Sequence, residues 1–469
     1  MRVLRDPDRL LSEGLAAIRA QFRVPDGFPP AVLAAAEAAA RRAPADHADW
    51  TERPFVTLDP ASATDLDQAF AIEPTAAAAN ADYLLHYAIA DVGWFVADDD
   101  VIDQEAWRRG VTTYLPDGKA GLYPPVLAEG AASLLPDGPR PAVVFTTRVA
   151  ADGAVRLEGV TRAVIRSRAK LAYDSVRDDQ LPPGFTALAA RIAAAEDRRG
   201  AARVDPPEQE VERAGDGRFT LRFRPMQPAE TRNAALSLAS NMAVADLLHA
   251  HGTGLFRVMA PPDEYAVARL RQTARAFGLD WPEAASLAQF ERLLDPADPR
   301  AAAFMLAIRR AGQGASYEPW QPGVTPWHAA MAATYAHATA PLRRLADRYV
   351  IRAALAVANG QPVPDAVTAA FARLPAVMGK ADARAGQIER AVIDLAETAM
   401  LAGREGESFA AVVTDIGETG ARFQLCDLPV VARVQAPGAL PGTPIRVRLD
   451  AADPVRRTLA FTRIEESAA

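Results

Sequence analysis

The order of the predicted elements constrains the fold of this chain more than any other feature of its sequence. Short β-branched and aromatic runs that predict strands lie at residues 55–58, 84–90, 143–149 and 154–162. Longer stretches with helical periodicity follow at residues 185–200, 229–250, 264–277, 301–311, 341–358 and 364–402. Residues 313–328, rich in Gly, Pro and Trp, are predicted to form a loop. Strands early and helices late predict an α+β core.

The two ends of the chain differ from this core. Residues 1–48 contain two short helical patterns separated by prolines, which suit either a helix-turn-helix domain or a structural cap. Residues 404–469 contain five short strands, at 409–413, 420–424, 430–434, 445–449 and 458–462. Such a series predicts a small OB-type barrel. We therefore expect three domains, at residues 1–48, 49–403 and 404–469.

Composition limits which kinds of site, compartment and partner we expect for this protein. The lone cysteine, Cys426, excludes an intramolecular disulfide and a cysteine-built zinc site. The sequence has no apolar run of membrane-spanning length and no secretion signal, so we expect a cytoplasmic protein without membrane contact. A net charge of −7 argues against non-specific coating of nucleic acid. A local basic strip at residues 140–171, which includes Arg166, is compatible with contacts to a nucleic-acid backbone or with a solvated basic face.

Three aspartates follow the first predicted strand at the spacing D-x5-D-x-D, namely Asp59, Asp65 and Asp67. Clustered carboxylates repel one another unless a positive charge offsets them, and a hard cation such as Mg²⁺ prefers oxygen ligands. Such a site can activate water next to a phosphate. The alternative is a solvated turn with N-capping aspartates.

A second segment, residues 334–349, carries two adjacent arginines. Pro341 suits the first turn of a helix, which would place Arg343 and Arg344 near a helix N-terminus. Backbone N–H groups there attract anions, and an arginine can hold a phosphate with two hydrogen bonds. The alternative is an ordinary exposed arginine pair.

Together, the segments TLDPASATDLDQAF and ATAPLRRLAD resemble the catalytic RNB domain of the RNase II/RNase R exoribonucleases. The segments HYAIADVGWFV, RRGVTTYLP, RSRAKLAYDSV and RRGAARVDPPE match the same family in order, so the resemblance covers roughly residues 50–400. It implies an RNB-type catalytic domain followed by an S1-like OB barrel that binds RNA. Bacterial members of the family usually carry two cold-shock-type barrels before the catalytic domain, and the residues before Phe55 are too few for both. We therefore expect a short form without them, and a helix-turn-helix RNA-binding domain becomes the favoured interpretation of residues 1–48.

The resemblance also implies an activity. Members of the family hydrolyse RNA processively from 3′ to 5′ with Mg²⁺ and release nucleoside 5′-monophosphates. We therefore expect the 3′ end of single-stranded RNA as the partner, a monomeric chain and no nucleotide cofactor.

Site residues carry over by position. Asp59, Asp65 and Asp67 resemble catalytic carboxylates, and together with Gln68 they are the expected metal ligands. Arg343 resembles the arginine that stabilises the phosphate in the transition state. The expected RNA contacts are Tyr114, Tyr173, Arg166 and Arg344. In the C-terminal barrel the candidate contacts are Phe409, Phe423 and Arg433.

The sequence departs from the family pattern at several positions. Gln68 stands where the family has a fourth aspartate, and Ala234 and Ala235 stand where it has two glutamates, for which Glu230 is a candidate substitute. Val204 replaces a stacking phenylalanine. These changes keep a second interpretation open, a catalytically weakened RNB-fold module that binds RNA. A third, a metal-dependent hydrolase of another phosphodiester, leaves the C-terminal barrel unexplained.

Overall fold

The computed structural model describes residues 2–4, 10–78, 81–202, 208–213, 219–224, 226–295, 298–312, 314–417 and 420–464. Within these residues, no helix combines the length and the apolar character needed to cross a membrane.

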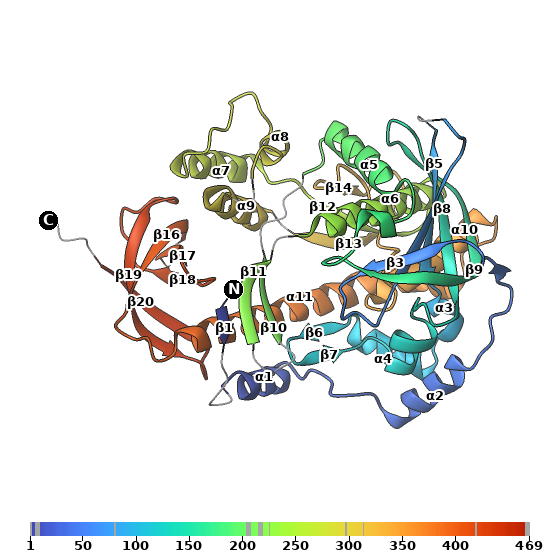
Figure 1. Cartoon of the computed structure of the whole chain (residues 1–469), viewed down its shortest axis with the longest axis horizontal. Helices are drawn as coiled ribbons and strands as arrows, with labels where there is room; N and C mark the ends of the chain where they lie inside the picture. Colours follow the sequence, from blue (N-terminus) through green and yellow to red (C-terminus); the bar gives the residue numbers. More distant parts are fainter. Residues whose placement is uncertain are drawn as a thin grey trace.

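A six-stranded sheet forms the centre of the molecule (Figure 1). Its strands, in spatial order, are β2 (Ala48–Asp49), β9 (Val155–Ala172), β3 (Phe55–Asp59), β4 (Gln68–Pro74), β5 (Tyr83–Ala90) and β8 (Pro139–Val149). The long strand β9 pairs in parallel with β3 through its last residues and antiparallel with β8 through its earlier ones. Because β8 and β9 also pair, five of the strands close into a ring.

Helices cover this sheet and supply the rest of the first core. They are α2 (Pro30–Ala40), α3 (Val92–Phe95), α4 (Val101–Arg109), the π-helical turn η1 (Leu127–Ala131), α5 (Phe185–Arg199), α6 (Pro228–Ala250) and α10 (Leu345–Ala358). The 3-10 turn η2 (Asp178–Gln180) between β9 and α5 buries no residue. Phe55, Phe70, Tyr87 and Phe145 from the strands are fully buried against these helices. Burial of such aromatic side chains is the main stabilising term of a core of this kind.

The long helix α11 (Asp365–Leu401) crosses the molecule and connects the central sheet to the C-terminal barrel (Figure 1). At 1.5 Å per residue it is about 55 Å long. The barrel strands are β16 (Ser408–Gly417), β17 (Gly420–Leu425), β18 (Val431–Val434), β19 (Pro444–Asp453) and β20 (Thr458–Ile464), in the order β18-β17-β16-β19-β20.

A second core joins segments that are far apart in sequence. It contains α1 (Leu10–Gln21), the end of α11, the barrel, and the hairpin of β6 (Thr113–Leu115) and β7 (Gly118–Ala120). Leu11 and Leu15 of α1 are buried there with Leu115 and Ala120 of the hairpin. The hairpin is thereby held between the N-terminal helix and α11.

The remaining elements form smaller units. One sheet consists of β1 (Arg2–Leu4), β11 (Phe219–Arg224) and β10 (Glu208–Arg213), and another of β13 (Ala315–Pro319), β12 (Leu255–Met259), β14 (Trp327–His328) and β15 (Ala333–Thr334). Helices α7 (Glu264–Ala276), α8 (Leu287–Glu291) and α9 (Pro299–Ala311) pack around a small core of their own.

Most predicted elements of the α+β core and all five C-terminal strands are confirmed, and most of their ends differ by a few residues. The strand predicted at 154–162 is an exception, because it continues to Ala172 as β9. The predicted loop at 313–328 is wrong in part, because β13 and β14 lie within it. Strand β4 was not predicted. At the N-terminus, α1 and α2 pack into different cores, and the helix-turn-helix interpretation of residues 1–48 stays a prediction.

Candidate active site

The loop between β3 and β4 carries the predicted carboxylates. Asp59 ends β3, Gln68 begins β4, and Asp65 and Asp67 lie on the connection between them. Leu66 anchors this connection, because its side chain is fully buried and its N–H donates to Ser133 Oγ at 2.9 Å. The buried leucine thereby fixes the short segment that carries Asp65 and Asp67.

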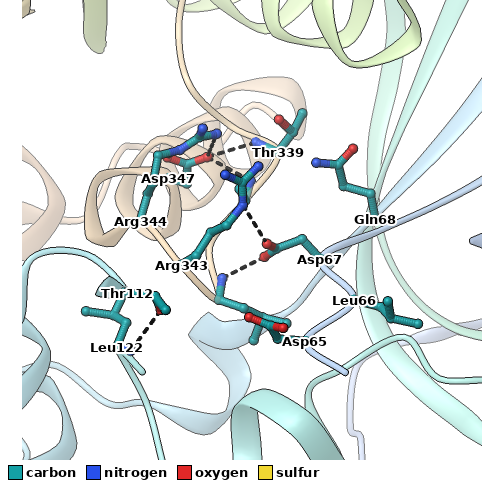
Figure 2. A network of polar contacts seen from close by, with 12 residues as sticks. Asp65, Leu66, Asp67, Gln68, Thr112, Leu122, Thr339, Arg343, Arg344 and Asp347 are labelled. Atoms are coloured by element: carbon teal, nitrogen blue, oxygen red, sulfur yellow. Dashed lines mark hydrogen bonds and ion pairs between the residues drawn. The ribbon is translucent and has the colours of Figure 1, made fainter. Parts of the chain in front are cut away.

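Asp67 is the most enclosed of the three carboxylates, with 4% of its surface exposed. Its Oδ1 accepts a hydrogen bond from the Leu342 backbone N–H at 2.7 Å, and its Oδ2 lies 3.4 Å from Nε of Arg343 (Figure 2). Burial raises the pKa of Asp67 to about 7, although the Arg343 charge opposes the shift. The site therefore holds a carboxylate whose charge is only partly compensated by the protein.

Arg343 reaches Asp67 through Nε alone. Within the described part of the chain, its two terminal nitrogens have no hydrogen-bond or ion-pair partner, and 43% of its side chain is exposed. A guanidinium in this state presents a free pair of donors of the kind that binds two phosphate oxygens.

The turn that precedes α10 places Arg343. The Asp347 carboxylate accepts hydrogen bonds from the backbone N–H groups of Thr339 and Ala340 at 3.0 and 2.8 Å, and from Arg344 at 2.9 and 2.8 Å (Figure 2). The expectation that Pro341 lies in the first helical turn is wrong, because α10 begins at Leu345 with Arg344 as its N-cap residue. A non-helical turn, closed by the ion pair between Arg344 and Asp347, lies where the first helical turn was expected.

Arg344 is thus engaged inside the fold. Burial opposes its charge, but the paired Asp347 carboxylate keeps the pKa of Arg344 above its usual value. The geometry assigns its side chain to holding the turn. Its predicted contact with RNA stays a prediction.

Asp59 lies beside Tyr173 at the end of the neighbouring strand β9. The Tyr173 backbone N–H donates to the Asp59 backbone carbonyl at 3.2 Å, and its hydroxyl accepts from Asn233 Nδ2 at 3.1 Å. Burial raises the pKa of Asp59 to about 6, with Arg343 opposing the shift and Asp65 adding to it. The structure therefore brings Tyr173, Asp59, Asp65 and Arg343 together, as the sequence predicts.

Asp65 contacts the β6–β7 hairpin. Lys119 Nζ lies 2.7 Å from Asp65 Oδ1, and the Tyr114 hydroxyl donates to Asp65 Oδ2 at 3.1 Å. Tyr114 is 54% exposed, so one face of its ring remains open to a ligand. Sequence reasoning missed Lys119 as a site residue. Its only signal was its rarity, since lysine occurs at just three positions in this chain.

Gln68 begins β4 of the central sheet, and its side-chain carbonyl accepts a hydrogen bond from the Tyr87 hydroxyl of the neighbouring strand β5. Figure 2 shows its side chain beside Thr339 rather than toward Asp65. Its predicted role as a metal ligand stays a prediction.

Other predicted residues lie away from these carboxylates. Arg166 is exposed on β9, and the other basic side chains of residues 140–171 are engaged by carboxylates or backbone carbonyls. Glu230 caps α6 and pairs with Arg224 at 3.0 Å. In the barrel, Phe423 is fully buried, so the expectation that it contacts RNA is wrong.

Ala234 and Ala235 line a largely apolar cavity of about 1000 Å³ beside α6. The fully buried helix positions around them offer no carboxylate in place of the family's glutamates. Val204 lies outside the described residues.

The donor set fits a divalent cation held by few protein ligands. Within the described residues, no three His, Cys, Asp or Glu side chains converge as a metal cage. Among the three aspartates, Asp59 and Asp67 are those whose buried charge is undercompensated. Asp65 has the Lys119 ammonium in direct contact at 2.7 Å, whereas the cation that faces Asp67 is the Arg343 guanidinium at 3.4 Å. Mg²⁺ often binds through one or two carboxylates, several waters and a substrate phosphate. Asp59 and Asp67 suit that mode of binding.

Two family models match parts of this chain. The RNB domain profile matches residues 47–359, and the profile of the RNase II-type exonuclease C-terminal S1 domain matches residues 407–464. Ribonuclease R of Aquifex aeolicus is 28% identical over 429 residues, which are 84% of this chain and 59% of that protein. Exoribonuclease 2 of Cronobacter sakazakii is 29% identical over 416 residues, 83% of this chain and 62% of that protein. The chain thus spans about three fifths of the length of these relatives.

Solved structures share the fold. Mycoplasma genitalium RNase R in complex with ribose-methylated single-stranded RNA aligns with a TM-score of 0.85 at 20% identity, covering 97% of this chain and 78% of that one. Yeast Ssd1, a pseudonuclease, aligns with a TM-score of 0.68 at 15% identity, covering 92% of this chain and 56% of that one. The predicted RNB-type fold with a C-terminal S1-like barrel is confirmed.

Proposed function

Because the chain belongs to the RNB family of RNase II-type exoribonucleases, we propose that it is an Mg²⁺-dependent 3′→5′ exoribonuclease acting on single-stranded RNA. The observation that carries the proposal is the meeting of Asp59 and Asp67 from one loop with Arg343, which lies far away in the sequence beside a turn fixed by Asp347. Residues 49–403 would then perform the chemistry, and residues 404–469 would bind RNA.

The proposed reaction is hydrolysis of the last phosphodiester bond. Water oxygen bonds to phosphorus, the bond from phosphorus to the upstream O3′ breaks, and that oxygen takes up a proton. A nucleoside 5′-monophosphate leaves, and the shortened chain keeps a 3′ hydroxyl. Negative charge grows on the phosphate oxygens during this step, and fixed positive donors lower its energy.

The free terminal nitrogens of Arg343 are the donors suited to that charge. The contact with Asp67 Oδ2 through Nε fixes the plane of the guanidinium before substrate arrives. Such preorganisation costs no further ordering at the moment of reaction. A divalent cation held by Asp59 and Asp67 would add positive charge at the phosphate and lower the pKa of an attacking water.

Two aromatic residues are suited to the terminal nucleotides. Tyr173 lies beside Asp59, and the half-exposed Tyr114 lies beside Asp65. Base stacking on such rings contributes ~1–3 kcal/mol per base and tolerates any base, which suits an enzyme that degrades RNA of any sequence. The RNA-bound relative of similar fold supports this use of the site.

A second candidate function is RNA binding without turnover. Gln68, bound to Tyr87, contributes no charge to the site, and a pseudonuclease shares the fold. This candidate predicts RNA affinity with no cleavage at any Mg²⁺ concentration.

The two functions separate in one experiment. Single-stranded RNA carrying a label at its 5′ end is incubated with the protein and Mg²⁺, with the Asp67→Asn variant and an EDTA sample as controls. The enzyme predicts a ladder of labelled products that shortens with time in the wild type alone. Immediate release of a labelled mononucleotide would mean the opposite polarity, and intact but retarded RNA would favour the binding module.

A further inference from the structure

Lys119 and Tyr114 occupy both oxygens of Asp65, one of the three carboxylates predicted to bind metal. Lys119 Nζ lies 2.7 Å from Oδ1, and the Tyr114 hydroxyl lies 3.1 Å from Oδ2. Lys119 also lies 3.3 Å from Glu129 Oε1, while the other oxygen of Glu129 accepts from Thr64 at 2.8 Å. The lysine is therefore fixed between two carboxylates at the edge of the site.

The hairpin is built to present these two side chains. Tyr114 of β6 and Lys119 of β7 are cross-strand partners, so both project from the same face. Leu115 and Ala120 alternate with them and are buried in the second core, on the opposite face. The alternation therefore turns one face of the hairpin to the core and the other to Asp65.

The hairpin is also tied to the N-terminal helix. Arg19 of α1 makes two hydrogen bonds to Asp117 in the hairpin turn, at 3.0 and 2.8 Å. Gly118 follows with φ of 137°, a conformation that favours glycine. The position of Lys119 is thus set by the fold on both sides of the turn.

Charge is distributed unequally among the three aspartates. Arg343 faces Asp67 and Lys119 faces Asp65, whereas the Asp59 side chain has no hydrogen-bond or ion-pair partner among the residues that the structure describes. The nearby Lys170 ammonium donates to the Ala61 backbone carbonyl at 2.9 Å. Gln68, the fourth predicted ligand, is neutral and bound by Tyr87. One divalent cation beside Asp59 and Asp67 would complete the compensation.

We propose that Lys119 takes the place of a second divalent cation, so that this site binds one metal ion through Asp59 and Asp67 while Asp65 stays paired with the lysine. The inference rests on the proposed metal-dependent function. An ammonium held at a carboxylate supplies a fixed positive charge without dissociating. Lys119 is in this sense a positioning residue, because it acts on the reaction through Asp65.

Counting bound ions tests this inference without any RNA. Mn²⁺, a common substitute for Mg²⁺ at oxygen ligands, is titrated into the full chain, and free Mn²⁺ is followed by electron paramagnetic resonance. The wild type should bind one ion per chain. The variants Lys119→Met and Lys119→Gln remove the ammonium from Oδ1 of Asp65, and each should bind a second ion. Lys119→Arg keeps the charge and should return the count to one.

Tyr114→Phe is the matched control, because it frees one oxygen of Asp65 without removing a charge and should leave the count at one. In the RNA assay, the Mg²⁺ dependence of the Lys119→Met rate should become steeper, with a Hill coefficient that rises from about 1 toward about 2 as the second ion binds. A lysine with only a structural role would change thermal stability and leave both readings unchanged.

The proposal is overturned if folded Lys119→Met and Lys119→Gln bind the same number of ions as the wild type, or if the wild type binds none or two. Failure of the exoribonuclease function is distinguishable, because it would leave the labelled RNA intact whatever the ion count.

Discussion

At the scale of the residue, the site separates the groups that we propose to act on the phosphate from the groups that hold them. Arg343 contacts Asp67 through Nε, and its two terminal nitrogens have no partner among the described residues. The neighbouring Arg344 is instead paired with the Asp347 carboxylate through two hydrogen bonds. The sequence places the two arginines side by side and cannot tell their roles apart. The difference arises from the buried carboxylate three residues further along the chain, which selects Arg344 as its partner.

The same limit applies to the carboxylates. The spacing of Asp59, Asp65 and Asp67 predicted a common site, and the structure brings them together. It did not predict that Asp65 would be neutralised by Lys119, because the hairpin that carries this lysine is far away in the sequence and its strands are only three residues long. Contacts of this kind follow from tertiary packing and leave no local pattern.

Asp67→Asn should abolish cleavage and leave RNA binding nearly intact. The amide keeps the shape of the side chain and can still accept from the Leu342 N–H, but it removes the charge beside Arg343. Loss of at least about 10²-fold in single-turnover rate is expected, in the range for groups that act directly on the reacting atoms. Filter binding of labelled RNA provides the affinity. Wild-type turnover in this variant would refute the assignment of Asp67.

Arg343→Lys should lower the chemical rate by about 10²–10³-fold with little change in affinity, because lysine keeps the charge but loses the two-pronged donor edge. Arg166→Ala, on the exposed face of β9, should do the opposite, with weaker binding, a shallower salt dependence and near-normal single-turnover chemistry. If Arg343→Lys lost only affinity, the arginine would be a backbone contact and the binding-module interpretation would gain.

At the scale of the element, the most informative feature is the connection from α1 through the β6–β7 hairpin to Asp65. Periodicity predicted α1 well, since Leu11, Leu15 and Ile18 all face one core. It could not predict which surface this helix covers. The structure shows that α1 packs with the hairpin and α11, and so the N-terminal helix supports the site without touching the carboxylates.

Errors in the predicted elements have a similar origin. Strand β4 begins at Gln68, directly after the loop that carries the three aspartates. Because the aspartate motif runs into the strand without a break, the sequence pattern did not predict a separate strand there. Residues 313–328 are rich in turn-forming residues, yet β13 finds a partner in β12 along its whole length. In both cases pairing with a neighbouring strand overrides a weak local preference.

Arg19→Met should loosen the hairpin and shift the site in the same direction as Lys119→Met, but less. The Arg19 and Asp117 side chains are 20% and 26% exposed, and an ion pair at the surface contributes ~0.2–1 kcal/mol, so we expect a fall of about two- to five-fold in single-turnover rate at low Mg²⁺. Arg41→Met, at the exposed end of α2, is the control from the same N-terminal unit and should leave the rate unchanged. Equal rates for all three proteins would show that α1 does not position the hairpin.

At the scale of the whole molecule, α11 joins the central sheet to the C-terminal barrel, and the buried Glu397 lies where this helix meets the barrel. Glu397 is 4% exposed, and its Oε1 accepts from Val431 N–H of β18 at 2.8 Å and from Gln209 Nε2 at 2.7 Å. Burial raises the pKa of Glu397 to about 7, with those two hydrogen bonds opposing the shift. The folded state therefore keeps a proton that the unfolded chain loses near its ordinary pKa of about 4.5.

Because of that difference, the stabilising contribution of protonated Glu397 is complete below about pH 4.5 and is lost as the pH rises to about 7. Glu397→Gln cannot ionise and keeps an oxygen for both hydrogen bonds. The free energy of unfolding of this variant should exceed that of the wild type by up to ~3 kcal/mol at pH 8 and by much less at pH 4.5. Urea unfolding at the two pH values checks this, with the exposed Glu405→Gln as control. An equal pH dependence in wild type and Glu397→Gln would contradict the account of the junction.

We propose that this site hydrolyses the bond between phosphorus and the upstream O3′ of RNA. Its most direct test is the product formed from single-stranded RNA and Mg²⁺ in water enriched in ¹⁸O, analysed by mass spectrometry under single-turnover conditions. The account predicts nucleoside 5′-monophosphates that carry one ¹⁸O in the phosphate, and their loss in Asp67→Asn. Nucleoside 3′-monophosphates, cyclic phosphates or intact RNA would contradict it.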